Sequence, residues 1–390
     1  MKWVTELHKR NLSQGKPTTG VEKVIDLGAL GFYAYVGTFD AVSISEIRNS
    51  GEVVNVEPDR SWSIDDKNLH RPLHDKRAPP QPVSQPRPQR RQVDVVRVWA
   101  NQRPTPWALG SISHRTPHHR DRYVFDIIAG KGTFAYLIDS DIAINHPDFD
   151  GRAKVGYTHS TRELLSGHGT AVASTIAGWP LGVAQSATLV DVKIDESLAN
   201  ADDNPHMTTS AVLKGLAWAI NNITAENRSD VSVINMSLNA GQVLVINTLV
   251  ELAFGDGILC VAAAGNEPID ARELSPAGAP SAITVGAVDE DNEMMFNSSY
   301  GPGVDIFAPG VDVDHSVLGG GRTTSGSSGT SLAAGFISGL VLYLKSTDGA
   351  YAKAKVVVGL LKELATKDVI TGLPEGTLNL LAFNGQPLGD

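Results

Sequence analysis

The chain has 390 residues, a formal net charge of -10 at pH 7, 42% hydrophobic residues and 19% charged residues. This composition indicates a soluble globular protein, and the negative charge argues against a general affinity for nucleic acid. The single cysteine, Cys260, excludes an internal disulfide framework. No window approaches the ~18 uninterrupted apolar residues of a membrane span, so no membrane partner is expected.

The first 63 residues have the pattern of a small α+β domain. We expect a helix around Val4 and Leu7, a strand at 31–39, a helix at 42–48 and a strand at 53–59. The chain opens with charged residues where a signal peptide would have its apolar region. A unit of this size is marginally stable alone and would gain from a partner surface.

Residues 64–98 differ in composition from their surroundings, and their central part, 75–92, is rich in proline, basic and nearly without apolar side chains. Such a segment is expected to be an exposed, semi-extended linker. The basic pairs Lys76-Arg77 and Arg90-Arg91 are candidate cleavage sites for a processing protease, or simply solvated charge.

Beyond the linker, residues 99–390 alternate between strand-like and helix-like segments. The strands are nearly continuous apolar runs, which is typical of a parallel sheet covered by helices on both faces. We therefore predict an α/β fold with a doubly wound, mostly parallel sheet flanked by helices. The expected strands lie at 133–139, 188–194, 231–238, 258–264 and 282–288, and the expected helices at 169–179, 210–224 and 243–254.

Polar residues follow several of these apolar segments, where functional groups gather in such sheets. Asp139 ends one strand, His168 stands between glycines at the start of an apolar helix, and Asn266 follows another strand. Each residue alone also fits a helix cap or a buried, hydrogen-bonded group. Cys260 lies inside an apolar run, which favours an inert buried thiol over a nucleophile.

A Gly/Ser-rich loop at 326–329 leads into a long apolar helix whose first turn contains Ser331. The unpaired N–H groups and the dipole of a helix N-terminus would stabilise an oxyanion formed beside this hydroxyl. Taken alone, the serine also fits an ordinary helix N-cap.

Together these segments form four blocks, at 136–140, 167–178, 263–266 and 328–334. They resemble the subtilisin-like serine proteases (peptidase S8), most closely the proteinase K-like branch seen in fungi. The chain order Asp, His, Ser distinguishes this family from other enzymes with the same triad. The resemblance extends over about residues 107–385.

The resemblance implies a serine endopeptidase that works through an acyl-enzyme. Asp139, His168 and Ser331 would be the catalytic triad, and Asn266 would complete the oxyanion hole. Broad specificity is expected, with an apolar side chain in the first pocket. The implied substrate-binding residues are Ser237, Leu238, Asn239, Ala263 and Gly265.

Two further points follow from the resemblance. A structural calcium ion would be bound by Pro280, Ala282 and Asp305, although these also fit two loop carbonyls and a solvated aspartate. No organic cofactor is expected. The segment 53–59 resembles the end of an inhibitory propeptide of the I9 type, so the N-terminal domain would inhibit and chaperone its own protease.

The propeptide's leading strand and the secretion signal have no counterpart in the sequence. We expect either a start downstream of the natural one or a protein that stays inside the cell. By resemblance the protease is secreted and monomeric, and its substrates are polypeptides.

Several positions depart from the family pattern while leaving the triad residues in place. Asp141, Ala171 and Gly335 replace a glycine, a histidine and a proline, Asn239 replaces a pocket glycine, and residues 204–206 replace a Gly-rich edge. Two alternative functions are a binding protein that has lost turnover and a specialised processing or peptide-joining enzyme of a biosynthetic pathway.

Overall fold

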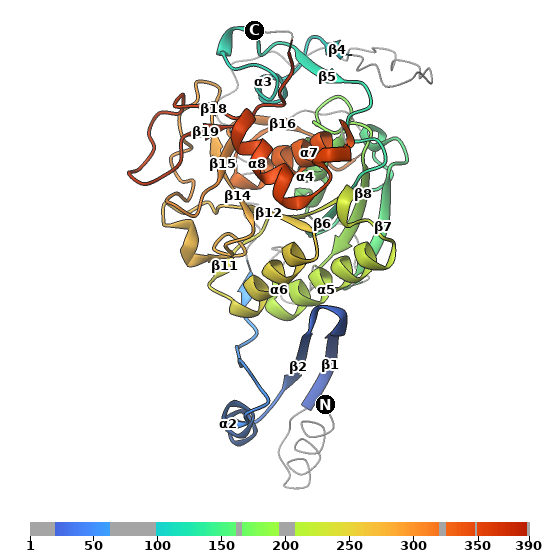
Figure 1. The fold of residues 1–390 in the computed structure, drawn as a ribbon, viewed down its shortest axis with the longest axis vertical. Helices are drawn as coiled ribbons and strands as arrows, with labels where there is room; N and C mark the ends of the chain where they lie inside the picture. The colour runs from blue at the N-terminus through green and yellow to red at the C-terminus, as the bar shows by residue number, and fades with distance from the viewer. Residues whose placement is uncertain are drawn as a thin grey trace.

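A nine-stranded sheet runs between two layers of helices in the computed structural model (Figure 1). The structure describes residues 20–62, 99–160, 166–194, 207–319, 325–347 and 349–387. The predicted first helix, the linker and the replaced edge at 204–206 therefore lie outside the described residues. Within them, the strand order is β18-β19-β15-β14-β12-β10-β6-β8-β7, and only β18 pairs in the antiparallel sense. The predicted doubly wound α/β fold is confirmed.

The strands of this sheet are short and mostly buried, whereas the helices that cover it are longer. The strands are β6 (Phe134–Asp139), β7 (Ala153–Thr158), β8 (Thr188–Lys193), β10 (Ser232–Met236), β12 (Leu259–Ala263), β14 (Ile283–Val288), β15 (Ile306–Pro309), β18 (Thr366–Lys367) and β19 (Leu380–Leu381). The main helices are α4 (His168–Ala177), α5 (Thr209–Ala225), α6 (Leu244–Gly255), α7 (Thr330–Thr347) and α8 (Ala354–Leu364).

Three smaller pairs of strands and the short helix α3 lie outside the nine-stranded sheet and its helical layers. They are β4 (Trp99–Gln102) with β5 (Tyr123–Asp126), β11 (Ala240–Gly241) with β13 (Leu274–Ser275), β16 (Val313–His315) with β17 (Ser325–Ser327), and α3 (Trp107–Ser111). No helix among the described residues is long and apolar enough to cross a membrane.

The apolar runs are strands because both of their faces are covered. Along β6, Ala135 and Leu137 belong to the core shared with α4 and α7, whereas Tyr136 and Ile138 belong to the core shared with α5 and α6. This alternation follows from the two-residue period of a strand. Strands β7, β15, β18 and β19 were not predicted. At the edge, β7 has mostly exposed side chains, and β18 and β19 are only two residues long.

Two glycines allow α7 to pack closely against α4. A Cβ atom on Gly335 would lie 2.0 Å from Thr175 Oγ1, and one on Gly339 would lie 2.8 Å from the Ile176 carbonyl oxygen. The absence of side chains at these positions is therefore what permits the crossing. Gly335, a departure from the family pattern, is one of the contact points of the two helices that carry the site.

The N-terminal domain lies against the outer helices on one side of the sheet (Figure 1). It contains the antiparallel hairpin β1 (Gly20–Leu27) and β2 (Phe32–Thr38), helix α2 (Ala41–Asn49) and the short strand β3 (Ser61–Trp62). Apolar residues of the hairpin, including Ile25 and Phe32, are buried in the same cluster as α5 and α6. The partner surface expected for this small unit is thus the protein's own α5–α6 layer.

The strand predicted at 53–59 is wrong, because the described structure has no strand there. Instead, Glu57 accepts hydrogen bonds from the Leu244 and Val245 N–H groups, at 2.8 and 2.9 Å. Asp59 accepts from the Ser210 N–H at 2.8 Å. The segment caps the N-termini of α6 and α5, where unpaired N–H groups and the helix dipole favour carboxylates. Pairing begins only afterwards, between β3 and β9 (Met207–Thr208).

Candidate active site

Asp139 and His168 meet where the carboxyl end of β6 faces the start of α4. The Nδ1 atom of His168 lies 2.8 and 3.0 Å from the two carboxylate oxygens of Asp139. Both side chains are almost completely buried, and the Ser140 N–H also donates to Asp139, at 2.7 Å. A neutral His168 bonded in this way carries its hydrogen on Nδ1, so Nε2 has the lone pair that a base needs.

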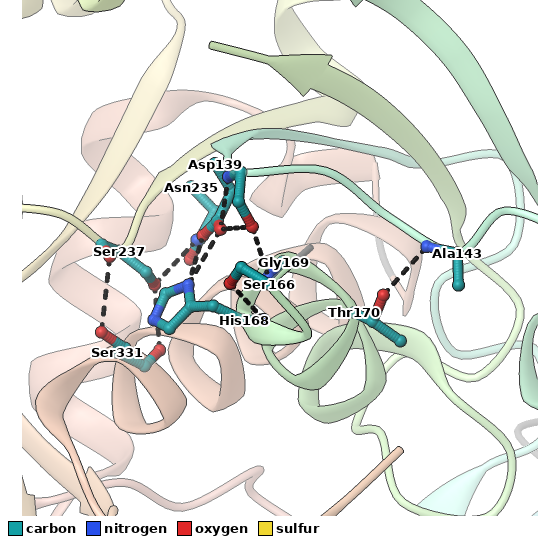
Figure 2. A network of polar contacts seen from close by, with 10 residues as sticks. Asp139, Ala143, Ser166, His168, Gly169, Thr170, Asn235, Ser237 and Ser331 are labelled. Atoms are coloured by element: carbon teal, nitrogen blue, oxygen red, sulfur yellow. Dashed lines mark hydrogen bonds and ion pairs between the residues drawn. The ribbon is translucent and has the colours of Figure 1, made fainter. Parts of the chain in front are cut away.

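Ser331 reaches the same place from a third element. It is the second residue of α7, and its hydroxyl donates to the Ser237 main-chain carbonyl at 3.4 Å. Figure 2 shows the imidazole ring of His168 between Asp139 and Ser331. The structure thus brings together the three residues that the sequence analysis singled out for the triad.

A chain of buried hydrogen bonds holds the start of α7 against β10. Ser338 donates to Asn235 at 2.9 Å, Asn235 donates to Ser237 at 3.0 Å, and the Ser237 hydroxyl donates to the Ser331 carbonyl at 3.0 Å (Figure 2 shows the last two). Sequence reasoning missed Asn235 and Ser338. The available signal was an amide inside an apolar strand, because a buried amide needs partners.

Asn266 is oriented by the residue that precedes Ser331. Its Oδ1 accepts from both the N–H and the hydroxyl of Thr330, each at 2.9 Å. Because the amide oxygen is engaged in this way, the group that Asn266 can offer a ligand is its NH2. The Thr330 hydroxyl also accepts from the Gly265 N–H at 3.2 Å, which ties the two loops together. Thr330 was not predicted as a site residue.

The predicted substrate-binding residues lie around the same edge of the sheet. Asn239 donates to the Ala263 carbonyl at 3.0 Å, which joins the segments after β10 and β12. Gly265 has a φ of +117°, and a Cβ there would meet Leu274 at 2.5 Å. Leu238 is buried in the core on the α5–α6 side of the sheet. The role of these residues as pocket walls stays a prediction.

Burial also decides the state of two groups outside the triad. Burial, followed by the charge of Asp141, raises the pKa of Asp191 to about 8. Burial raises the pKa of Cys260 to about 12, so this thiol stays protonated and is inert, in line with its position inside an apolar strand.

Asp305, which is predicted to hold calcium together with Pro280 and Ala282, has other partners in the structure. One oxygen of Asp305 contacts the Lys362 ammonium at 2.7 Å, and the other accepts from the Thr284 N–H at 3.0 Å. Between Pro280 and Ala282, Ser281 is bound through its N–H and its hydroxyl to Glu251, both at 2.7 Å. No group of three or more His, Cys, Asp or Glu side chains in the described segments is arranged to hold a metal. A lysine ammonium is thus the cation beside Asp305.

Comparisons with known proteins show the family of the chain. The subtilase family profile matches residues 130–376, and the peptidase inhibitor I9 profile matches residues 1–65. Subtilisin-like proteinase Mp1 of Magnaporthiopsis poae is 43% identical over 99% of this chain and 87% of its own. Alkaline protease 1 of Emericella nidulans is 38% identical over 98% of this chain and 86% of its own.

A solved structure is also similar. The crystal structure of a cold adapted subtilisin-like serine proteinase superposes with a TM-score of 0.64 at 32% identity, over 72% of this chain and 98% of that one. The chain therefore belongs to the subtilase family of serine endopeptidases and carries a peptidase inhibitor I9 domain at its N-terminus.

Proposed function

We propose that this protein cleaves peptide bonds through a triad of Asp139, His168 and Ser331 and an acyl-enzyme intermediate. The observation that carries the proposal is the 2.8 Å contact between His168 Nδ1 and Asp139, with Ser331 on the far side of the ring. A serine hydroxyl is a weak nucleophile near neutrality and needs a base within reach.

In this mechanism Nε2 of His168 takes the Ser331 proton as Oγ attacks the peptide carbonyl. His168 then gives that proton to the leaving amine. A water molecule, activated by His168 in the same way, attacks the acyl-enzyme and releases the acyl group. Asp139 keeps the ring in the required tautomer and stabilises the imidazolium. Its complete burial strengthens this interaction, because little water screens the pair.

The negative oxygen of the tetrahedral intermediate would be bound by the Asn266 NH2 group and the Ser331 N–H. Two observations support this assignment: Thr330 fixes the amide oxygen of Asn266, and Ser331 lies in the first turn of α7. We expect Asn266→Ala to lower kcat by about 100- to 1000-fold, a magnitude that comes from subtilisin itself.

Substrate would bind as an added strand, because every peptide offers the same main-chain groups. The protein's own strand β3 supports this mode, since Ser61 and Trp62 pair with Thr208 and Met207 in the antiparallel sense. Ser237, Asn239 and Gly265 would border the first pocket, which is expected to prefer an apolar side chain. Beyond this preference, broad specificity is expected.

The I9 domain would act as an intramolecular inhibitor until it is removed. Two contacts support this role: Glu57 and Asp59 cap the N-termini of α6 and α5, and apolar residues of the β1–β2 hairpin are buried against these two helices. Under this proposal residues 1–63 are the propeptide, 64–98 the linker and 99–390 the peptidase domain, which acts as a monomer.

A protease that carries its own inhibitor can be made safely before export, so we propose that it is secreted. Finding the mature mass in cells but not in medium would contradict secretion.

The nucleophile is tested with a fluorophosphonate probe and a casein assay. Ser331→Ala should lose both labelling and casein hydrolysis, whereas Ser328→Ala in the same loop should keep both. Labelling that persists in Ser331→Ala would reassign the nucleophile. Wild-type protein that is labelled without hydrolysing casein or peptides would instead support the binding-protein alternative, and ligated products in a mass spectrum would support a peptide-joining enzyme.

A further inference from the structure

Three carboxyl groups and one ammonium group are buried together at the carboxyl ends of β6 and β8. The pairing of these strands sets Lys193 opposite Asp139 and Asp191 opposite Leu137. Because side chains alternate along a strand, all of these side chains lie on the face covered by α4 and α7. Asp141 follows just after β6. The four ionisable residues are between 0% and 6% exposed.

The single cation of this cluster is already engaged. Lys193 Nζ lies 3.0 Å from Asp141 Oδ2, and both side chains are less than a tenth exposed. Asp139 is engaged by His168. Three acids therefore share one ammonium group and one imidazole, an arrangement in which three simultaneous negative charges would be costly.

Asp191 is the member that the protein leaves without full compensation. The Ile142 N–H donates to its carboxyl group, but Oδ1 is buried and has no hydrogen-bond partner among the described residues. On the other side, the residue of β7 paired with Asp191 is Val155, which brings no charge. The charged groups that act on Asp191 in the described structure are thus Asp141, Asp139 and Lys193, and His168 of α4 contacts Asp139 in turn.

We propose that Asp191, together with the Asp141–Lys193 ion pair, is a positioning group that sets the charge behind the Asp139–His168 pair and so tunes the proton affinity of His168. This inference rests on the triad proposed above. Asp191 does not touch the reacting atoms, and it acts only through Asp139 and His168.

The direction of the effect follows from the charges. Burial and the Asp141 charge raise the pKa of Asp191 to about 8, so its carboxyl is neutral near pH 7. When it ionises above pH 8, a further negative charge appears in a poorly screened region. That charge favours the imidazolium form of His168, which makes His168 a stronger base and stabilises the charge that it acquires in the transition state.

The protease should therefore show two rises in kcat with increasing pH. The first belongs to His168 losing its own proton, and the second, near pH 8, belongs to Asp191. A buried charge that acts on His168 through Asp139 is expected to change kcat by roughly threefold to tenfold, with little change in KM.

The test is the pH dependence of kcat and KM for the mature protease on a chromogenic peptide amide, from pH 5 to pH 10. Active enzyme is counted with the fluorophosphonate probe, so a misfolded fraction does not affect kcat. Asp191→Asn should keep the first rise and lose the second, giving kcat above pH 9 roughly threefold to tenfold below wild type. Asp291→Asn, which removes an exposed acid from a surface turn, should keep both rises.

A second variant keeps the inference testable if Asp191→Asn does not fold. Asp141→Asn removes the like charge beside Asp191 and leaves Lys193 to attract it, so the second rise should move to lower pH. A single rise in wild type, or two unchanged rises in Asp191→Asn or in Asp141→Asn, would overturn the inference. A different result would contradict the proposed triad, namely labelling by the fluorophosphonate probe that persists in Ser331→Ala.

Discussion

Gly169 lies so close to Asp141 that a Cβ atom built on it would be 2.1 Å from the Asp141 main-chain oxygen and 3.1 Å from Asp139 Oδ1. The residue after His168 therefore has no room for a side chain. Since the obstacle is main chain, it cannot rotate away as a flexible side chain would.

This contact predicts that Gly169→Ala will displace the start of α4 from β6. Because the His168–Asp139 geometry depends on that distance, we expect kcat to fall by about 100-fold, as for other small displacements in active sites. Gly359→Ala is the matched control: it is also a helical glycine, but its Cβ would meet nothing within 4 Å. It should keep full activity and gain about 0.5–1 kcal/mol in stability. Equal activity of the two variants would argue against the steric explanation.

The raised pKa of Asp191 also predicts how stability changes with pH. The carboxyl titrates near pH 8 in the folded state and near its ordinary value of 3.8 when unfolded. Between these values the folded protein binds the additional proton, so this group lowers stability progressively from about pH 4 to pH 8. Asp191→Asn, made on Ser331→Ala to prevent autolysis, should gain melting temperature over its parent across this window and stay constant above it. A difference independent of pH would contradict the assignment.

The caps supplied by Glu57 and Asp59 predict how the inhibitor domain is held. Glu57→Gln with Asp59→Asn keeps the shapes but removes both charges from the N-termini of α6 and α5. Each charge at a helix N-terminus contributes about 0.3–1 kcal/mol, so the inhibitor should be released roughly threefold to thirtyfold more readily. The measurement is residual activity of the intact precursor over time.

Glu52→Gln provides the control for this prediction, because Glu52 is exposed in the same domain and belongs to neither cap. It should mature like wild type. Increased salt should also weaken inhibition in wild type more than in the double variant, since exposed charges are screened. An identical salt response in both proteins would remove the electrostatic role of the caps.

The Lys362–Asp305 contact predicts that chelators have no effect on stability. Because the ammonium occupies the carboxylate that calcium would need, the melting temperature of Ser331→Ala should be the same with calcium and with chelator at fixed ionic strength. Lys362→Met removes the competing cation, so calcium should then raise the melting temperature. Stabilisation of the parent by calcium would restore the ion to the site predicted from the sequence.

The sequence by itself determined the class of fold and the identity of the three residues proposed for catalysis. The physical reason is that these signals are local: an unbroken apolar run must be covered on both faces, and Asp139, His168 and Ser331 stand where such runs begin or end. The order of the blocks then separated this family from other serine enzymes. Asn266 was accessible in the same way, because it directly follows a strand.

What only the tertiary structure decided are contacts between residues far apart in the chain. The segment at 53–59 has the composition of a strand, yet its carboxylates are bound by α5 and α6, which follow more than a hundred residues later. In the same way, Asp305 meets Lys362 and Asp191 meets Asp141 only after the sheet and helices have packed. Whether a carboxylate binds a metal, caps a helix or holds a proton depends on the partners that folding brings to it, and no local pattern encodes them.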